Sequence, residues 1–171
     1  MDVSTVDQLE ILGRLVLAGL LGGFVGIERE VRGYPAGIRT LALVSVGSAL
    51  FTDVSGLLGG EDRVAAQVVT GIGFIGAGVI FREGYTVRGI TTAATIWSAA
   101  AIGMAIGAEL YVVGVLGSLF VFAVLEARPL TRRVDEFLRL IGGELREEED
   151  ENGERQDQMR PLEKPKRGPG K

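Results

Sequence analysis

The stretch that decides the fold is GGFVGIEREVRGYPAGIRTLALVSVGSALF, residues 22–51. An apolar, glycine-rich segment ends near Ile27, a short connection carries three arginines, and a second apolar segment follows. A bilayer core about 30 Å thick requires about 20 apolar residues per helix. Both apolar segments extend beyond the quoted stretch, so we predict two membrane helices joined by a short basic loop.

Five such apolar segments occur in the first 126 residues. They are Leu9–Ile27, Thr40–Leu58, Val64–Phe81, Ala93–Ala108 and Leu110–Leu125. The last two are short for spans, and we expect each to use flanking residues or locally thin bilayer. Buried helices of a soluble protein are the alternative, but helices with almost no polar face argue against it. We therefore predict an all-α fold, an integral membrane bundle of five transmembrane helices with tight small-residue packing.

The charged residues are concentrated near the C-terminus. Mean hydropathy is +0.30 although 23% of the residues are charged. Residues 1–126 contain 7 arginines and 11 acidic residues, whereas residues 127–171 contain 11 basic and 11 acidic residues. We predict a transmembrane domain in 1–126, a cytoplasmic amphipathic juxtamembrane helix in 127–143 and a disordered charged tail in 144–171. An ordinary helix packed against the base of the bundle is the alternative for 127–143.

The composition excludes several classes of site. The chain contains no cysteine and no histidine, which excludes thiol nucleophiles, imidazole bases and metal sites built from those residues. No nucleophile–base pair or carboxylate dyad is apparent, so we expect no enzyme activity, no cofactor and no bound metal. The net charge of −4 does not indicate a nucleic-acid partner.

The positions of the arginines predict the orientation in the membrane. The connection 28–39 and the connection 82–92 contain five arginines, and Arg128, Arg132 and Arg133 follow the last apolar segment. The connections on the other side contain only Arg63. Because cytoplasmic loops are enriched in Lys and Arg, we expect the N-terminus outside and the C-terminus in the cytoplasm.

Glycine is the most informative small residue in the apolar segments. Small residues allow membrane helices to approach closely. We expect this packing role for Gly19, Gly22, Gly23, Gly26, Gly71, Gly73, Gly76, Gly78, Gly103 and Gly107. Residues 71–76 also match the dinucleotide motif G-x-G-x-x-G, but they lie inside an uncharged apolar run rather than between a strand and a helix. A glycine face is therefore the better interpretation of that motif.

Three ordered motifs carry a family resemblance. Residues 22–51 are followed by EDRVAAQVVTGIGFIGAGVIF (61–81) and VRGITTAATIWSAAAIGMAIG (87–107). Together they resemble the MgtC/SapB membrane proteins over nearly all of residues 9–126. The resemblance implies a non-enzymatic, multi-pass protein of the bacterial inner membrane, linked to growth at low magnesium and acting on other membrane proteins. The best-studied relatives carry an ACT-type C-terminal domain. This chain has a short charged tail there, so it is more similar to the shorter, SapB-like branch.

The resemblance and the predicted topology place many polar residues at the cytoplasmic ends of the helices. This predicted cytoplasmic cluster comprises Glu28, Arg29, Glu30, Arg39, Thr40, Arg82, Arg88, Thr91, Thr92 and Thr95. An acid at a helix C-terminus is unfavourable, so we expect Glu28 to pair with Arg39 across the loop. We also expect Thr91 or Thr92 to cap the fourth helix. The cluster could bind a partner or ligand; the alternative is that these residues are topology signals, caps and interfacial anchors.

Two further charges lie well inside apolar segments. Arg14 lies 13 residues before Ile27, and Asp53 lies 13 residues after Thr40. At 1.5 Å per residue, both lie about 20 Å from the inner boundary of two antiparallel neighbouring helices. We expect an intramembrane pair of Arg14 with Asp53. The alternatives are that each charge reaches water alone, or that Arg14 pairs with Glu10 one turn away.

Three classes of function follow from these patterns. The favoured class is a regulatory or accessory protein whose partners are the lipid bilayer and another membrane protein, with a homo-oligomer as a further option. A transporter or channel subunit is the alternative, but the last three spans contain no ionisable residue of the kind that marks ion paths. The third class is a purely structural membrane module.

Overall fold

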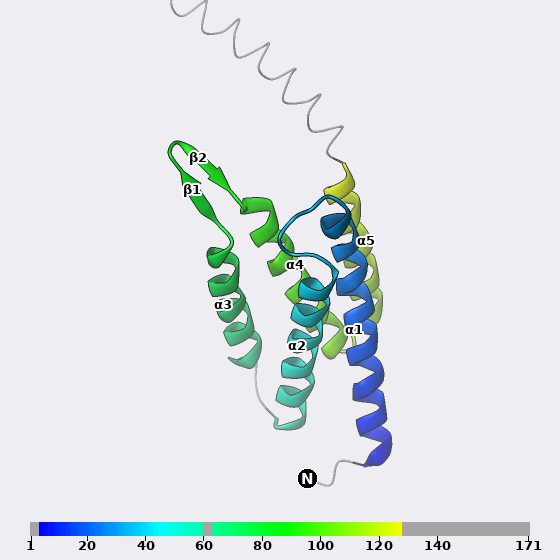
Figure 1. Cartoon of the computed structure of the whole chain (residues 1–171). Coiled ribbons are helices and arrows are strands. Elements are labelled where there is room, and N and C mark those ends of the chain that lie inside the picture. The colour runs from blue at the N-terminus through cyan, green and yellow to red at the C-terminus, as the bar shows by residue number, and fades with distance from the viewer. Residues whose placement is uncertain (1–3, 60–62, 128–171) are drawn as a thin grey trace, which may run out of the picture. The chain divides into compact units, whose positions relative to one another are not determined.

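The computed structural model describes residues 4–59 and 63–127. Their five helices and two short strands, drawn in Figure 1, are α1 (Thr5–Val31), α2 (Ile38–Leu57), α3 (Arg63–Gly78), β1 (Phe81–Glu83), β2 (Thr86–Arg88), α4 (Ile90–Gly107) and α5 (Tyr111–Glu126). The predicted all-α helical bundle is therefore confirmed. The juxtamembrane helix and the tail predicted beyond Ala127 lie outside the described residues.

Three of the helices are long and apolar enough to cross a membrane. These are α1, α2 and α4, with 27, 20 and 18 residues. Helices α3 and α5 are also apolar but contain 16 residues each. Helices of this length cross only where the bilayer thins or where flanking residues extend the span. The chain is accordingly a membrane protein with an apolar helical bundle.

Helix α1 extends one turn further than its apolar run. Ser4 and Asp7 form a reciprocal capping box at its start, which satisfies two of the free N-terminal amide groups. The helix continues past Ile27 to Val31, and then Gly33, with a φ of 72°, and Pro35 end it. As a result, Glu28 and Arg29 lie on the helix rather than in a loop.

The centre of the bundle is formed by α1, α2 and α4, with α5 covering α1 and α4. Helices α1 and α2 meet where Gly22 faces the backbone of Leu41, and a Cβ added to Gly22 would lie 2.5 Å from the Leu41 carbonyl oxygen. Helices α4 and α2 meet in the same way at Gly103 and Gly107. On the other side, Phe24 stacks on Phe122 of α5 with ring centroids 4.6 Å apart. Backbone contact through glycine therefore sets the spacing of the central helices.

Helix α3 lies at the edge of the bundle, beside α2 and α4 (Figure 1). It buries Ile72 and Gly76, the latter against Ala93 of α4. The opposite face is open, and Phe74 is 84% exposed. Helix α3 thus presents most of its apolar surface outward.

A β-hairpin follows α3, where the apolar run had predicted helix as far as Phe81. Helix α3 ends at Gly78, and β1 pairs with β2 in antiparallel register, with Phe81 opposite Arg88. Gly84 has a φ of 60°, as the first central position of a two-residue hairpin turn requires. Gly89 then begins α4 with a φ of 92°, and its Cα packs against the Val79 backbone. The turn at Gly84 and the left-handed conformation of Gly89 therefore form a hairpin that separates α3 from α4.

Candidate functional site

Among the residues that the structure describes, the ion pairs lie at the two ends of the bundle. The Glu28 cluster consists of Glu28, Arg29, Arg32, Tyr34 and Glu126, at the end where α1 joins α2. The Arg14 cluster consists of Glu10, Arg14, Asp53, Glu109 and Tyr111, at the end nearer the N-terminus. Between them, the central helices pack through apolar and small residues.

In the Glu28 cluster, one buried carboxylate contacts two arginines. The Arg29 Nε donates to Glu28 Oε2, and Arg32 Nε lies 2.8 Å from Glu28 Oε1. Arg32 also reaches α5, where its Nη2 lies 2.8 Å from Glu126 Oε2. The predicted pairing of Glu28 with Arg39 was wrong, since Arg39 is exposed at the start of α2. The extra turn of α1 places Arg32 four residues from Glu28 on the same helix face, so no loop crossing is needed.

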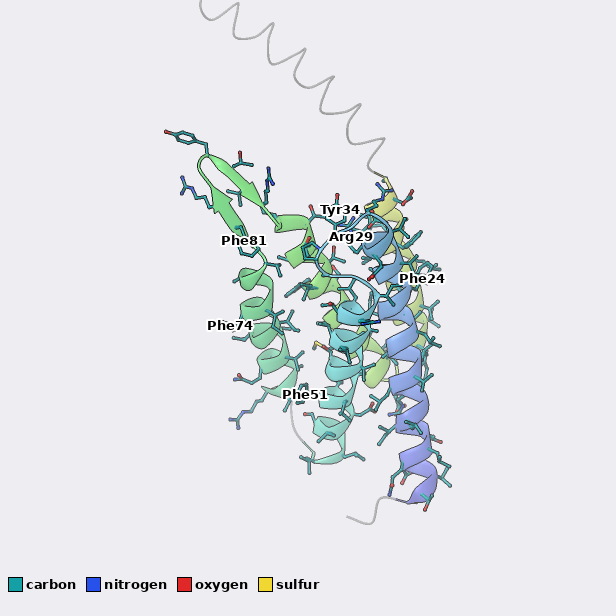
Figure 2. The ribbon with its side chains drawn as sticks, viewed as in Figure 1. Phe24, Arg29, Tyr34, Phe51, Phe74 and Phe81 are labelled. Atoms are coloured by element: carbon teal, nitrogen blue, oxygen red, sulfur yellow. The ribbon has the colours of Figure 1, made fainter. Side chains whose placement is uncertain are left out.

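Arg29 is the most deeply buried charge among the described residues. Its side chain is fully buried, and its Cζ lies 4.2 Å from the centre of the Tyr34 ring. Figure 2 shows the two side chains together at the α1–α2 connection. Its Nη1 and Nη2 have no hydrogen-bond partner among the described residues. A desolvated cation therefore depends on Glu28 and the tyrosine ring for its stabilisation.

Glu30 has a different role from Glu28 and Arg29. Its Oε2 accepts a hydrogen bond from the Ile38 amide at 3.0 Å. The N-cap of α2 is Gly37, which has no side chain to cap the helix. A carboxylate from α1 thus caps α2 and complements the positive end of its dipole. Sequence reasoning missed this cap because the acceptor comes from another element, eight residues earlier.

The threonines do not cap α4 as predicted. The N-cap is Gly89, without a side-chain cap, and Thr91 and Thr92 already lie within the helix. Thr92 and Thr95 are buried, and the Thr95 hydroxyl donates to the Thr91 carbonyl oxygen at 2.7 Å. Because α4 already begins at Ile90, Thr92 and Thr95 follow its first residue and are buried in the bundle. They therefore do not occupy the N-cap position.

The predicted cytoplasmic cluster separates into a buried part and an exposed part. Glu28, Arg29, Thr92 and Thr95 are buried within the bundle. By contrast, Glu30, Arg39 and Thr91 are exposed, and Thr40 is half-buried. Arg82 and Arg88 are exposed on the hairpin strands, where Arg82 Nε donates to the Gly84 carbonyl oxygen at 3.2 Å. The ten residues therefore do not share one surface.

The Arg14 cluster joins three parts of the chain. Arg14 Nη1 lies 2.6 Å from Asp53 Oδ1, so the structure brings together the two charges that occur inside apolar runs. Arg14 Nη2 lies 2.7 Å from Glu109 Oε1 and 3.8 Å from Glu10 Oε2. Its Nε donates to the Tyr111 hydroxyl at 3.1 Å. One guanidinium thus connects α1, α2 and the α4–α5 turn.

Glu109 and Tyr111 were not predicted as members of this cluster. Glu109 is the one non-glycine residue with positive φ in the described chain, at 62°. It follows the Ala108 C-cap of α4, a position that usually carries glycine. The left-handed conformation costs a non-glycine residue roughly 1–2 kcal/mol. The glutamate therefore occupies a strained position from which its carboxylate reaches Arg14.

A cavity of about 290 Å³, the Arg14 cavity, adjoins this cluster. Its lining includes Asp7, Glu10, Arg14, Asp53 and Glu109. The Asp53 side chain is 1% exposed, and its Oδ2 has no hydrogen-bond partner among the described residues. Buried polar atoms are normally satisfied by protein, water or ligand. No group of three or more acidic side chains in residues 4–59 and 63–127 is placed to hold a metal ion.

An apolar groove of about 650 Å³ separates α2 from α3. Gln67 and Ser48 are its polar lining residues, one from each helix. On α3, added Cβ atoms at Gly71, Gly73 and Gly78 would meet nothing within 4 Å, so their expected packing within the bundle was wrong. Because α3 lies at the edge of the bundle, no neighbouring helix reaches these three glycines: Gly71 lines the groove, and Gly73 lies on a different side of α3. The predicted packing glycines that do contact a neighbouring helix are Gly19, Gly22, Gly23, Gly26, Gly76, Gly103 and Gly107.

Comparisons with known proteins find sequence similarity over most of the chain. The family model described as MgtC family matches residues 15–134. The chain is 51% identical over 113 residues to Protein MgtC of Brucella abortus (strain 2308), covering 63% of this chain and 48% of the relative. It is 47% identical over 130 residues to the Escherichia coli (strain K12) protein named "Putative magnesium transporter YhiD", covering 68% and 60%. It is 52% identical over 96 residues to Protein MgtC of Salmonella typhimurium, covering 54% and 41%.

The similarity is confined to part of these relatives. The chain spans about half the length of the curated relatives it matches. No solved structure matches the chain. The comparisons therefore bear on the helical membrane domain, and not on segments of the relatives that lie outside the match.

Proposed function

Since the chain belongs to the MgtC family, we propose that it is a regulatory or accessory membrane protein that acts by binding another membrane protein. In this proposal it is not an enzyme, and it lies in the bacterial inner membrane with its N-terminus outside and its C-terminus in the cytoplasm. The arginine-rich α1–α2 connection and the hairpin that carries Arg82 and Arg88 lie at one end of the bundle, which supports that orientation.

One observation carries the proposal, the open glycine face of α3. Gly71 and Gly78 lie seven residues apart on one side of α3 and have no neighbour within 4 Å of an added Cβ, unlike Gly22, Gly103 and Gly107 of the central helices. In lipid, small residues favour close packing with another helix, since lipid chains offer no comparable fit to a helix backbone. The face is therefore suited to a helix from outside this chain.

The adjacent groove adds a polar contact to this surface. Gln67 from α3 and Ser48 from α2 line an otherwise apolar groove between the two helices. Polar side chains that face lipid-exposed grooves commonly hydrogen-bond to a neighbouring helix, which contributes about 1 kcal/mol in membranes. A partner helix with a small or polar face fits this combination, and a second copy of the chain is one source of such a helix.

The link to magnesium rests on the relatives. The name of the Escherichia coli relative refers to magnesium transport. We propose that the partner bound by this chain acts under magnesium limitation, which is compatible with both the name of that relative and an accessory role. Crosslinking from membranes of cells grown at low and at high magnesium tests that dependence.

The experiment uses a photo-crosslinking residue at Phe74, which is exposed on α3. In membranes, the wild-type face should give one discrete crosslinked product, and Gly71→Leu should abolish it without lowering yield, because an added side chain at Gly71 meets no atom of this chain. The matched control is Gly13→Leu, another open glycine, on α1, which should leave the product intact. An unchanged product in Gly71→Leu, or no product at any magnesium level, would contradict the proposal.

Transport is the second candidate, and the Arg14 cavity is the observation that favours it. Ionisable side chains inside membrane helices often mark ion paths, and Arg14 and Asp53 line this cavity. Against it, Ala18 and Ala49 lie one helical turn from Arg14 and Asp53, toward the other end of the bundle, and are fully buried in a packed cluster with Ile106. Flux of labelled magnesium into proteoliposomes that contain the pure protein would establish transport. Flux no faster than in empty vesicles would exclude it.

A further inference from the structure

The charges that line the Arg14 cavity do not balance. Among the described residues the lining contains four carboxylates, those of Asp7, Glu10, Asp53 and Glu109, and one guanidinium, that of Arg14. With all groups ionised, three negative charges remain without a positive counterpart. A small, partly enclosed cavity concentrates this field and attracts cations.

Asp53 is an independent indication of a ligand in this cavity. Its carboxylate is almost completely buried, and only Oδ1 is paired, with Arg14 at 2.6 Å. The second oxygen, Oδ2, accepts no hydrogen bond from the described residues although Asp53 lines the cavity. An unsatisfied buried carboxylate oxygen is costly, and a donor group placed in the cavity would remove that cost.

Glu109 points to the same cavity through its backbone. Glycine in this left-handed position would be free of strain, whereas glutamate keeps a carboxylate at the cavity. Arg14 already has a partner in Asp53, so a second ion pair is not required to neutralise it. Strained residues of this kind cluster where a ligand is held.

The size and lining of the cavity define the kind of cation. Its volume of about 290 Å³ exceeds that of a single ion, and Ile11 and Leu57 add apolar surface. The described acidic side chains do not converge as metal ligands. We propose that the Arg14 cavity binds a small aliphatic ammonium or guanidinium compound, with its N–H groups on the carboxylates and its chain against Ile11 and Leu57. This site lies on a different surface from the proposed helix-binding face of α3 and does not depend on it.

Spermidine is a suitable probe, because its three positive charges match the three unbalanced carboxylates. Isothermal titration of the full chain in nanodiscs of neutral lipid should show saturable binding at low ionic strength. Glu109→Gln and Glu10→Gln should each raise Kd about tenfold, as expected for one lost charge-assisted hydrogen bond. The matched control is Glu126→Gln, which removes the same charge from an exposed position at the opposite end and should leave Kd unchanged.

A second variant separates binding from folding. Glu109→Gly removes the carboxylate and the backbone strain together, so the melting temperature should hold or rise while spermidine binding weakens about tenfold. Three results would overturn the proposal. They are the absence of saturable binding, an equal loss of affinity in Glu126→Gln, and saturable binding of magnesium but not of spermidine at these carboxylates.

Discussion

At the scale of single residues, the bundle holds two charged groups whose partners are unequal in burial. Arg14 is shared between Asp53, which is buried, and Glu109, which is largely exposed. Glu28 is shared between Arg29, which is buried, and Arg32, which is partly exposed. Removing one member of a buried pair leaves the other charge without compensation, whereas exposed pairs contribute little. The two clusters should therefore respond asymmetrically to substitution.

The first prediction concerns Arg14 and Asp53. Arg14→Leu strands the buried Asp53 carboxylate and should lower stability by roughly 3–5 kcal/mol. Asp53→Leu should cost less, because Arg14 keeps Glu109. The double variant should recover part of the loss, which thermal unfolding in detergent would measure. Strictly additive losses would mean that the pair contributes nothing.

The second prediction concerns Glu28. Glu28→Gln leaves the fully buried Arg29 guanidinium without a counter-charge and should destabilise the fold by roughly 3–5 kcal/mol. Arg32→Gln is the comparison, since Arg32 is 31% exposed and its loss should cost about 1 kcal/mol or less. Similar melting temperatures for both variants would contradict a structural role for the buried pair.

At the scale of elements, glycines occur both where two helices are in close contact and where a helix surface has no neighbour. Gly22, Gly103 and Gly107 hold backbones in contact, whereas Gly71, Gly73 and Gly78 of α3 have no neighbour. Glycine is also needed for the hairpin, because Gly84 and Gly89 have positive φ. A glycine-rich apolar run therefore encodes packing, an open face or a turn, depending on what lies opposite it.

The third prediction compares two glycines with positive φ. Gly89→Ala should lower the melting temperature strongly, because the new Cβ would collide with the Val79 backbone as well as strain φ. Gly59 also has a positive φ, 63°, but an added Cβ there would meet nothing within 4 Å. Gly59→Ala should therefore cost only the conformational strain, roughly 1–2 kcal/mol. The melting temperatures of the two variants in detergent measure the difference. Equal effects would mean that the close approach at Gly89 relaxes without cost.

At the scale of the whole molecule, the two ends of the helical bundle differ in charge. The end with the α1–α2 connection and the hairpin carries exposed arginines, and the other end carries the acidic Arg14 cavity. This asymmetry agrees with the orientation we propose, in which the arginine-rich end is cytoplasmic.

The fourth prediction tests that orientation. Reporter fusions after Leu58 and Ala108 should report an outside location, and fusions after Arg82 and Arg128 a cytoplasmic one. Neutralising Arg82 and Arg88 together should weaken the bias by removing positive charge from one cytoplasmic connection. The reverse pattern in the wild type would overturn both the orientation and the cytoplasmic assignment of the Glu28 cluster.

The sequence by itself determined the helical membrane class, the positions of the apolar segments and the family, because hydropathy and ordered motifs are local properties of the chain. It also placed Arg14 and Asp53 at matched depth, since a short connection makes α1 and α2 antiparallel neighbours. Only the tertiary structure decided that Glu109 and Tyr111 join Arg14, that Glu30 caps α2, and that Gly71, Gly73 and Gly78 of α3 meet no neighbouring helix. These features depend on which helix faces meet in space, and neither composition nor spacing along one segment encodes that choice.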